Sequence, residues 1–390
     1  MKKFISVFCV ILVLFSTFSY SMANAASANK KEAIACENIL KAMTLEEKVG
    51  QLFIIRPETL DTKYTKEQAG DTKKYAVTKI NKNIKKNLKE YKVGGVIMFA
   101  KNISNPKQII KLNADLQRNS KTKLFICVDE EGGSVARIAN NKNFNVKKFS
   151  GMQTIGETGK TSKAKDVGKT IGKYLKEYQF NLDFAPVADV NTNSKNIVIG
   201  KRAFDSKPSV VSKMVDAEIK GFHEVGIMTC VKHFPGHGDT KGDTHTGYVA
   251  VNKTWKQLKN CELVPFEQAF KSPTDMVMVA HITADKVSKD GLPASLSYNM
   301  ITEKLRNELK YTGVVITDSM EMGAIANNYT SAESAVMAIK AGADIVLMPY
   351  DFKKAYKAVL KAVKSGEISE KRLNESVLRI LKLKEKYKLL

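Results

Sequence analysis

Residues Ile227 to Gly247 read IMTCVKHFPGHGDTKGDTHTG, an apolar run followed at once by a loop crowded with polar side chains. The loop from Lys232 to Gly247 holds three of the chain's five histidines, two aspartates and four glycines. Glycine permits close backbone approach to a ligand, and side chains that exchange protons gather where chemistry occurs. We therefore expect a buried strand that delivers a functional loop.

Apolar runs of this kind recur along the chain, and amphipathic stretches separate them. They are rich in Val, Ile, Met and Phe and mostly lack alternation, which is typical of parallel strands buried on both faces. The eight runs are Gln51–Ile55, Gly94–Phe99, Leu124–Val128, Leu182–Ala188, Ile227–Val231, Asp275–Ala280, Gly313–Ile316 and Ala343–Met348. Helical patterns include Thr161 to about Tyr178, Pro208 to about Glu224, Thr302 to about Leu309 and Ser331 to about Ala341. Eight strand–helix alternations predict an α/β fold, a (β/α)8 TIM barrel.

Polar residues at the ends of the runs give an independent check on this prediction. Asp129, Asp189, His233, His281 and Asp318 each follow successive runs. The active site of a (β/α)8 barrel lies at the carboxyl ends of its strands, so these side chains should share one mouth. The competing architecture is a doubly wound open sheet, which would gather the site at one switch point.

The N-terminus has the pattern of a secretory signal peptide. Lys2-Lys3 precedes an apolar run from Phe4 to about Phe18, and Ala23-Asn-Ala25 offers a cleavage site. A membrane anchor is the alternative, but the run of about 15 residues is shorter than the ~20 that span a bilayer. We expect a signal over 1–25, a single barrel domain with closing helices over 26–390, and a secreted or cell-wall-associated protein.

The net charge is strongly positive and is carried mostly by lysine. It is +23 for the whole chain, and subtracting Lys2 and Lys3 leaves +21. This balance favours electrostatic retention on an anionic surface such as a bacterial wall polymer, although solvated helix faces explain it equally well. Arginine is scarce, which argues against nucleic acid.

The cysteines indicate neither a metal site nor a disulfide. No CxxC spacing occurs, so no zinc site is expected. Cys127 and Cys230 lie in strand-like runs and should be buried, and Cys36 and Cys261 lie in helical patterns whose redox state the sequence leaves open.

Two elements could carry catalysis. Asp318, in VVITDSMEM directly after a strand, is suited to attack an electrophilic carbon, although an N-cap for the following helix is a competing role. Asp243 and His245, two residues apart in the glycine-rich loop, could form a dyad in which the carboxylate orients and charges the imidazole for acid/base work. The loop could close over a bound substrate.

Other residues at the strand ends could bind substrate. Lys232 and His233 offer hydrogen bonds to substrate oxygens, and Asp129 could hold two hydroxyl groups. Arg137 and Arg202 lie in loops that can return to the same pocket. The competing roles are a histidine that merely lines the barrel and surface ion pairs of little energetic value.

Together these motifs resemble the family-3 glycoside hydrolases, specifically the β-N-acetylglucosaminidases of the bacterial peptidoglycan-recycling type. The resemblance runs from about Gly50 to about Pro349 through VDEEGG…R, GKRAF, KHFPGHG followed by DTH, and ITDSMEM. It implies a (β/α)8 barrel, a retaining two-step mechanism and no cofactor. It places the nucleophile at Asp318, the acid/base at His245 with Asp243 as its partner, and contacts to the N-acetylglucosamine at Asp129, Arg137, Arg202, Lys232 and His233.

The expected reaction is release of terminal β-linked N-acetylglucosamine from peptidoglycan fragments or related glycans. Some relatives carry a second α/β domain, but only about 40 residues follow Pro349, as in the single-domain members. Three alternatives remain: a phosphorylase that uses phosphate in place of water, a non-enzymatic wall-binding protein, and a metal-dependent hydrolase. The metal ligands in the last case would be His233, His237, Asp239 and His245.

Overall fold

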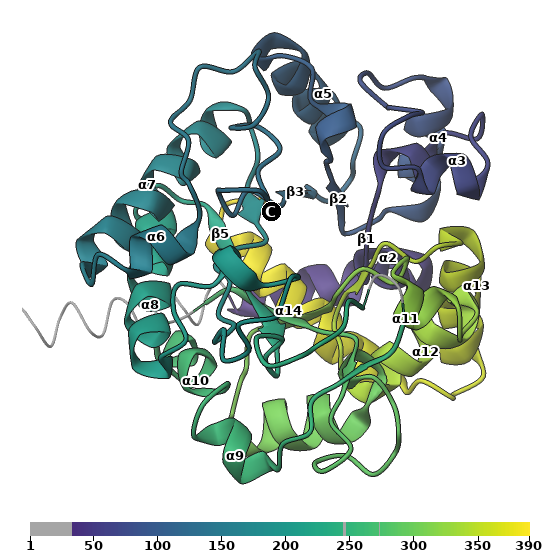
Figure 1. Ribbon diagram of the computed structural model, residues 1–390. Helices are drawn as coiled ribbons and strands as arrows, with labels where there is room; N and C mark the ends of the chain where they lie inside the picture. The colour runs from purple at the N-terminus through teal and green to yellow at the C-terminus, as the bar shows by residue number, and fades with distance from the viewer. Residues whose placement is uncertain (1–32, 245–246, 273) are drawn as a thin grey trace, which may run out of the picture.

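The barrel strands follow one another in chain order around a ring. The structure is a computed structural model that describes residues 33–244, 247–272 and 274–390. Eight parallel strands are hydrogen-bonded in the order β10-β1-β2-β3-β4-β5-β7-β9, and a bridge between Ile316 and Ile345 joins the two ends of this row. Helices surround the ring (Figure 1). The strands are β1 Phe53–Ile55, β2 Gly95–Ile97, β3 Phe125–Val128, β4 Leu182–Asp183, β5 Met228–Phe234, β7 Met276–Val279, β9 Val314–Thr317 and β10 Val346–Leu347.

The predicted (β/α)8 barrel is confirmed, and each apolar run overlaps one of its strands. Six strands lie within their runs, whereas β5 and β9 continue past theirs to Phe234 and Thr317. Every residue of these eight strands is buried, because the barrel interior covers one face and the helices cover the other. The fourth run is the least regular. Only Leu182–Asp183 forms a strand there, and Val187 makes an isolated bridge to Lys232.

Amphipathic helices fill the connections between strands and pack their apolar faces against the barrel. A helix also covers residues 33–42. The α-helices are α2 Leu45–Gln51, α3 Lys66–Gly70, α4 Lys82–Tyr91, α5 Pro106–Arg118, α6 Met152–Gly156, α7 Thr161–Glu177, α8 Pro208–Glu224, α9 Trp255–Lys259, α10 Val264–Lys271, α11 Gly323–Ala326, α12 Ser331–Ala341, α13 Phe352–Lys364 and α14 Glu370–Lys386. Short 3-10 turns are η1 Pro57–Leu60, η2 Ala100–Asn102, η3 Gly200–Arg202 and η4 Ala294–Leu296.

The helical patterns in the sequence locate most of these elements. The helix predicted from Pro208 to Glu224 is α8 with the same bounds. The segment expected to be helical from Thr302 begins earlier, at Asn299, and winds as a π-helix (η5 Asn299–Glu308). Amphipathic spacing indicates a helix but does not reveal whether its hydrogen bonds span four residues or five.

Helix α14 closes the amino-terminal end of the barrel and crosses behind the strands in Figure 1. The side-chain amine of Lys384 is fully buried there and donates to Gln51 Oε1 at 2.7 Å and to the Gly94 carbonyl at 3.0 Å. Burial lowers the pKa of Lys384 to about 7. Lys386 and Tyr387 both bind the buried carboxylate of Asp275, which directly precedes β7. Polar contacts therefore seal the end of the barrel opposite the strand carboxyl ends.

Cys36, Cys127 and Cys230 lie where the sequence pattern predicts, whereas Cys261 lies in the turn between α9 and α10 and not in a helix. Cys36, Cys127 and Cys230 are buried, and Cys261 is half-buried; Cys127, Cys230 and Cys261 are free thiols. Within residues 33–244, 247–272 and 274–390, no helix combines the length and apolar character needed to cross a membrane.

Candidate active site

The carboxyl ends of β3 and β5 bring a buried lysine between two carboxylates. Lys232 lies near the end of β5, and its Nζ is 2.9 Å from Asp129 Oδ1 and 2.5 Å from Glu131 Oε1. Burial alone would lower the pKa of Lys232, but the two carboxylates outweigh it and hold that pKa above its ordinary value. The amine therefore stays charged, and it faces a mouth where Asp129 retains 19% of its side-chain exposure.

Arg202 adds a second positive charge to the group formed by Asp129, Lys232 and Glu131. Its Nε and Nη2 donate to the two oxygens of Glu131 at 2.8 and 2.7 Å, a bidentate geometry that fixes the guanidinium plane. Nη2 also lies 3.4 Å from Nε2 of His233. Glu131 was not singled out in the sequence, yet it orients two predicted substrate-binding residues at once.

The three consecutive acids after β3 have three different roles. Asp129 and Glu131 face Lys232, whereas Glu130 points into the protein and accepts from the backbone amides of residues 137–139 and from the Tyr174 hydroxyl. The motif indicated a carboxylate site but not which carboxylate would face it. Glu130 instead shapes the loop that returns Arg137 to the mouth.

Arg137 reaches Asp129, as expected, but only at 3.6 Å between Nη2 and Oδ2. Its guanidinium also lies 5.6 Å from the Phe99 ring centre, and Arg56 lies over the same ring at 4.0 Å. Arg56 pairs with Glu321, three residues after Asp318, at 2.7 Å. Neither Arg56 nor Glu321 stood out in the sequence, because their segments come together only when the ring closes between β9 and β10.

The Asp189 carboxylate connects His233 to the start of the glycine-rich loop. Its Oδ2 accepts from Nδ1 of His233 at 2.7 Å, and its Oδ1 accepts from the His237 amide at 2.6 Å. A carboxylate only accepts, so Nδ1 carries the proton and Nε2 of a neutral His233 ring is left as an acceptor. Asp189 is fully buried. One side chain thus sets both the tautomer of His233 and the position of the loop.

Asp318 lies directly after β9 at the same mouth and is partly buried. The Ser319 amide donates to its Oδ1 at 2.7 Å. Burial alone would raise the pKa of Asp318, but the attraction of the His233 and His281 rings in their protonated form, the Ser319 amide and the charge of Lys232 together outweigh it and hold that pKa below its ordinary value. The side chain is therefore an ionised carboxylate, the form that acts as a nucleophile.

His281, at the end of β7, supports the segment that follows Asp318. Its Nε2 lies 2.8 Å from the Ser319 carbonyl, and its Nδ1 lies 2.7 Å from the Ser295 hydroxyl. The predicted gathering of polar residues from five strand ends at one mouth is thus what the barrel geometry produces.

The Asp243–His245 dyad cannot be placed, because His245 lies outside the described residues. Asp243 is partly buried and Thr244 is buried. The Thr244 carbonyl accepts from the Ala324 amide of α11 at 3.0 Å, which ties the loop to the segment after Asp318. The dyad remains a prediction.

Further contacts anchor the glycine-rich loop before Asp243 and the chain that follows the loop. The Asn196 amide donates to the His237 carbonyl at 2.8 Å, and the Tyr248 and Tyr329 hydroxyls are 3.4 Å apart. Strand β6 (Val249–Ala250) then pairs in parallel with β8 (Ile282–Thr283). The loop is therefore held beside the mouth from three directions.

Three of the residues considered as metal ligands, His233, His237 and Asp239, have other partners, and the fourth, His245, lies outside the described residues. Asp189 binds His233, Thr240 lies 2.7 Å from Nδ1 of His237, and Asp239 accepts from Thr192 at 2.9 Å. Among the residues that the structure describes, no three His, Cys, Asp or Glu side chains are grouped so that they could hold a metal ion.

The sequence matches a known family. The sequence profile of the glycosyl hydrolase family 3 N-terminal domain matches residues 44–383. This match spans the whole barrel and every site residue described above, so the chain belongs to glycosyl hydrolase family 3.

Individual proteins are also similar to this chain in sequence and in structure. The chain is 35% identical over 376 residues to a β-hexosaminidase A of Pseudoalteromonas piscicida, covering 88% of this chain and 61% of that protein. It is 32% identical over 283 residues to a β-hexosaminidase of Hydrogenovibrio crunogenus, covering 70% and 76% respectively. A family-3 β-N-acetylglucosaminidase structure from Paenibacillus sp. FPU-7 superposes with a TM-score of 0.81 at 36% identity, covering 89% of this chain and 63% of that one. The chain thus spans about three fifths of the length of the first and third of these relatives.

Proposed function

We propose that this chain is a retaining β-N-acetylhexosaminidase that releases terminal β-linked N-acetylglucosamine from peptidoglycan fragments or related glycans. The names of its relatives support the sugar, and the motif that contains Asp318 supports the mechanism. One observation carries the proposal: the Asp318 carboxylate shares its mouth with Lys232, which binds Asp129 and Glu131, and with His233. These groups can hold sugar hydroxyls beside a nucleophile.

The sugar-binding part of the proposal follows from the hydrogen-bonding capacity of these groups. Asp129 accepts only, whereas Lys232 and Arg202 donate only, and a neutral His233 presents Nε2 as an acceptor. A sugar hydroxyl both donates and accepts, so acceptors and donors side by side can bind each hydroxyl twice. Because the donors are already fixed by Glu131 and Asp129, little reorganisation is needed when substrate arrives.

In the first step an Asp318 oxygen bonds to the anomeric carbon while the bond from that carbon to the leaving oxygen breaks. We assign His245 as the group that gives its proton to that oxygen, with the Asp243 carboxylate favouring the charged ring. In the second step His245 takes a proton from water, the water oxygen bonds to the anomeric carbon, and Asp318 departs as a carboxylate. The two inversions together retain the anomeric configuration.

Trapping of the covalent intermediate tests the nucleophile. A slow fluorinated N-acetylglucosaminyl donor should add one sugar to the protein, and peptide mapping should find it on Asp318. Asp318→Ala should nearly abolish turnover and form no adduct. A stable adduct on another residue would overturn the assignment.

Two leaving groups test the acid role. His245→Ala should slow hydrolysis of a disaccharide about 10²- to 10⁴-fold, the usual contribution of proton transfer. An activated aryl glycoside needs little protonation, so its cleavage should slow much less. Equal losses on both substrates would remove His245 from this role.

Assays with and without phosphate separate hydrolysis from phosphorolysis, since phosphate could replace water in the second step. Free N-acetylglucosamine as the product in both buffers would support the hydrolase. A sugar 1-phosphate detected by mass would contradict it and support the phosphorylase alternative.

We also propose that the protein is secreted or wall-associated after removal of residues 1–25, which lie outside the described residues. The charged start, the short apolar run and the Ala23–Ala25 site support this. The mature N-terminus from culture medium and wall fractions should be Ala26. Full-length protein found only inside cells would contradict the proposal.

A further inference from the structure

Two outer helices carry a concentration of lysine with almost no acid. The buried side of α13 consists of Phe352, Ala355, Tyr356, Val359 and Ala362, and its remaining face is open to solvent. The exposed lysines are Lys82, Lys85, Lys86 and Lys89 on α4, and Lys353, Lys354, Lys357, Lys361 and Lys364 on α13. Within these two helices, which the structure describes completely, Glu90 is the one carboxylate.

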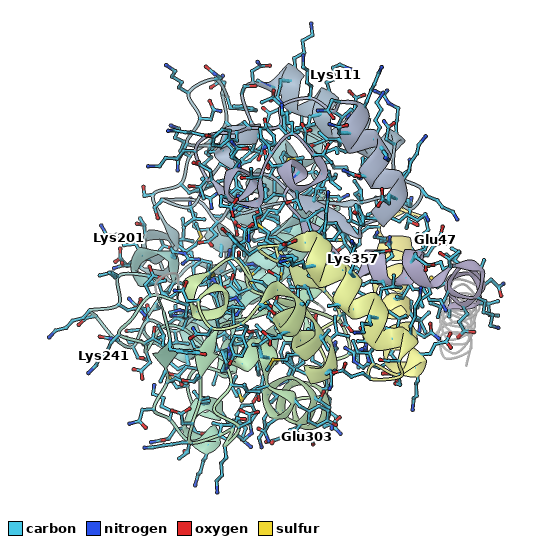
Figure 2. All side chains as sticks on the ribbon, turned by 90° about the vertical axis from the view of Figure 1, so that its right-hand side faces the viewer. Glu47, Lys111, Lys201, Lys241, Glu303 and Lys357 are labelled. Carbon is cyan, nitrogen blue, oxygen red and sulfur yellow. The ribbon has the colours of Figure 1, made fainter. Side chains whose placement is uncertain are left out.

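The end of α4 packs against the first turns of α13, which brings the lysines of both helices to the same side of the barrel. Tyr91, at the end of α4, packs edge-on against Phe352 and Tyr356 of α13, with ring centres 5.1 and 5.2 Å apart. Both helices lie along the right-hand edge of Figure 1, and Figure 2 faces this side with Lys357 labelled near its middle. We call these nine lysines the α4–α13 basic face.

Carboxylates pair with several lysines of other outer helices, whereas most lysines of this face have no such partner. Lys111 pairs with Asp115 on α5, and Lys220 pairs with Asp216 on α8. On the α4–α13 basic face, Lys364 lies 3.4 Å from Glu46 and Lys354 lies 3.9 Å from Asp351. In the part of the chain that the structure describes, the other seven form no ion pair. Their mutual repulsion opposes folding, and their summed potential attracts anions.

The chemistry of the face selects the kind of partner. A helix that lies on a membrane presents apolar side chains beside its lysines, but none of the large apolar side chains exposed among the described residues belongs to α4 or α13. The face also lacks arginine, whose planar fork reads bases and carboxylates in bidentate fashion. Lysine binds phosphate as a point charge.

The spacing of the lysines fits a chain of charges. Lys353, Lys357 and Lys361 are four residues apart, so a positive charge recurs about every 6 Å along α13. We propose that the α4–α13 basic face binds a soluble linear phosphodiester polymer, of the kind found in cell walls, laid along α13. The face is on the side wall of the barrel, so a bound polymer leaves the mouth open to substrate.

Salt-dependent binding to immobilised poly(glycerol phosphate) tests this proposal. The test variant is Lys353→Gln, Lys357→Gln and Lys361→Gln. The matched control is Lys163→Gln, Lys173→Gln and Lys213→Gln, three exposed lysines on α7 and α8 that form no ion pair with any described residue and lie on the opposite side of the barrel. Both variants lower the net charge equally, so only the position of the charge differs.

Each lysine that contacts the polymer should add about 0.7 to the slope of log Kd against log salt concentration. The α13 variant should therefore lose about 2 from this slope, and the control variant should keep the slope of the unsubstituted protein. Equal losses in both variants would show that net charge alone acts and would overturn the proposal. Binding to phosphatidylglycerol vesicles without binding to the polymer would also overturn it, since a membrane would then be the partner.

Hydrolysis of a small aryl N-acetylglucosaminide should be the same in both variants and in the unsubstituted protein, since none of the six lysines lies at the mouth. This readout separates the surface proposal from the proposed function, because either can fail while the other stands.

Discussion

Replacing Asp189 with asparagine should impair catalysis without displacing the glycine-rich loop. The asparagine carbonyl can still accept from the His237 amide, which now lies 2.6 Å from Asp189 Oδ1. Its NH2 group would replace Oδ2, which now accepts from Nδ1 of His233 at 2.7 Å. His233 must then accept at Nδ1 and carry its proton on Nε2, which points at the Arg202 guanidinium 3.4 Å away. Two donors would face each other, and the acceptor offered to substrate would be lost.

The size of the effect follows from the bond that is removed. A hydrogen bond to a charged group contributes about 1.5–3 kcal/mol, and each 1.36 kcal/mol corresponds to a factor of ten in rate. We therefore expect kcat/KM to fall about 10- to 150-fold in Asp189→Asn. The assay is steady-state hydrolysis of an aryl N-acetylglucosaminide.

The matched control is Asp275→Asn at the opposite end of the barrel. Asp275 is also a buried aspartate bonded to a histidine, with His223 Nε2 at 2.8 Å, but it precedes β7 and faces α14. This variant should lose about 1–3 kcal/mol of unfolding free energy and keep its kcat/KM. In Asp189→Asn the proton of the His233 ring should move from Nδ1 to Nε2, which ¹⁵N spectra detect. The His233 signals are identified by their absence in His233→Gln. An unchanged tautomer, or equal kinetic losses in both variants, would refute the reasoning.

Two stability predictions concern buried charges at the two ends of the barrel. Burial alone would raise the pKa of Glu131, but Arg202 and Lys232 hold that pKa well below its ordinary value. Ionised Glu131 therefore stabilises the fold above about pH 4.5. This stabilisation is lost as the pH falls toward the pKa of Glu131 in the folded state. Glu131→Gln should therefore be less stable than the unsubstituted protein at pH 7, and the difference measured by urea unfolding should shrink from pH 5 to pH 3; a constant difference would contradict the ion pairing. The pKa of Lys384 is lowered from 10.5 to about 7, so the unfolded chain holds one more proton than the folded chain between these values and stability should rise by about 1.4 kcal/mol per pH unit from this group. Lys384→Met should lack that increment between pH 7.5 and 9, and equal slopes in the two proteins would contradict a neutral buried amine.

The sequence located the strands because each is buried on both faces. It also indicated most of the polar residues that the structure brings to the mouth, because the strand ends meet there. Asp318, His233 and Lys232 could be found in this way. Glu131 could not be separated from its two acidic neighbours, since side-chain direction in a loop depends on the fold. The pairing of Arg56 with Glu321 joins residues 265 positions apart, and they meet only because the ring closes between β9 and β10, the strand next to β1.

A crystal structure of Asp318→Asn with a disaccharide that ends in β-linked N-acetylglucosamine tests the central claim most directly. We predict that the anomeric carbon lies in contact with residue 318, with the sugar hydroxyls bound by Asp129, Lys232 and His233. A sugar bound with its anomeric carbon away from residue 318, or outside the barrel mouth, would contradict the account.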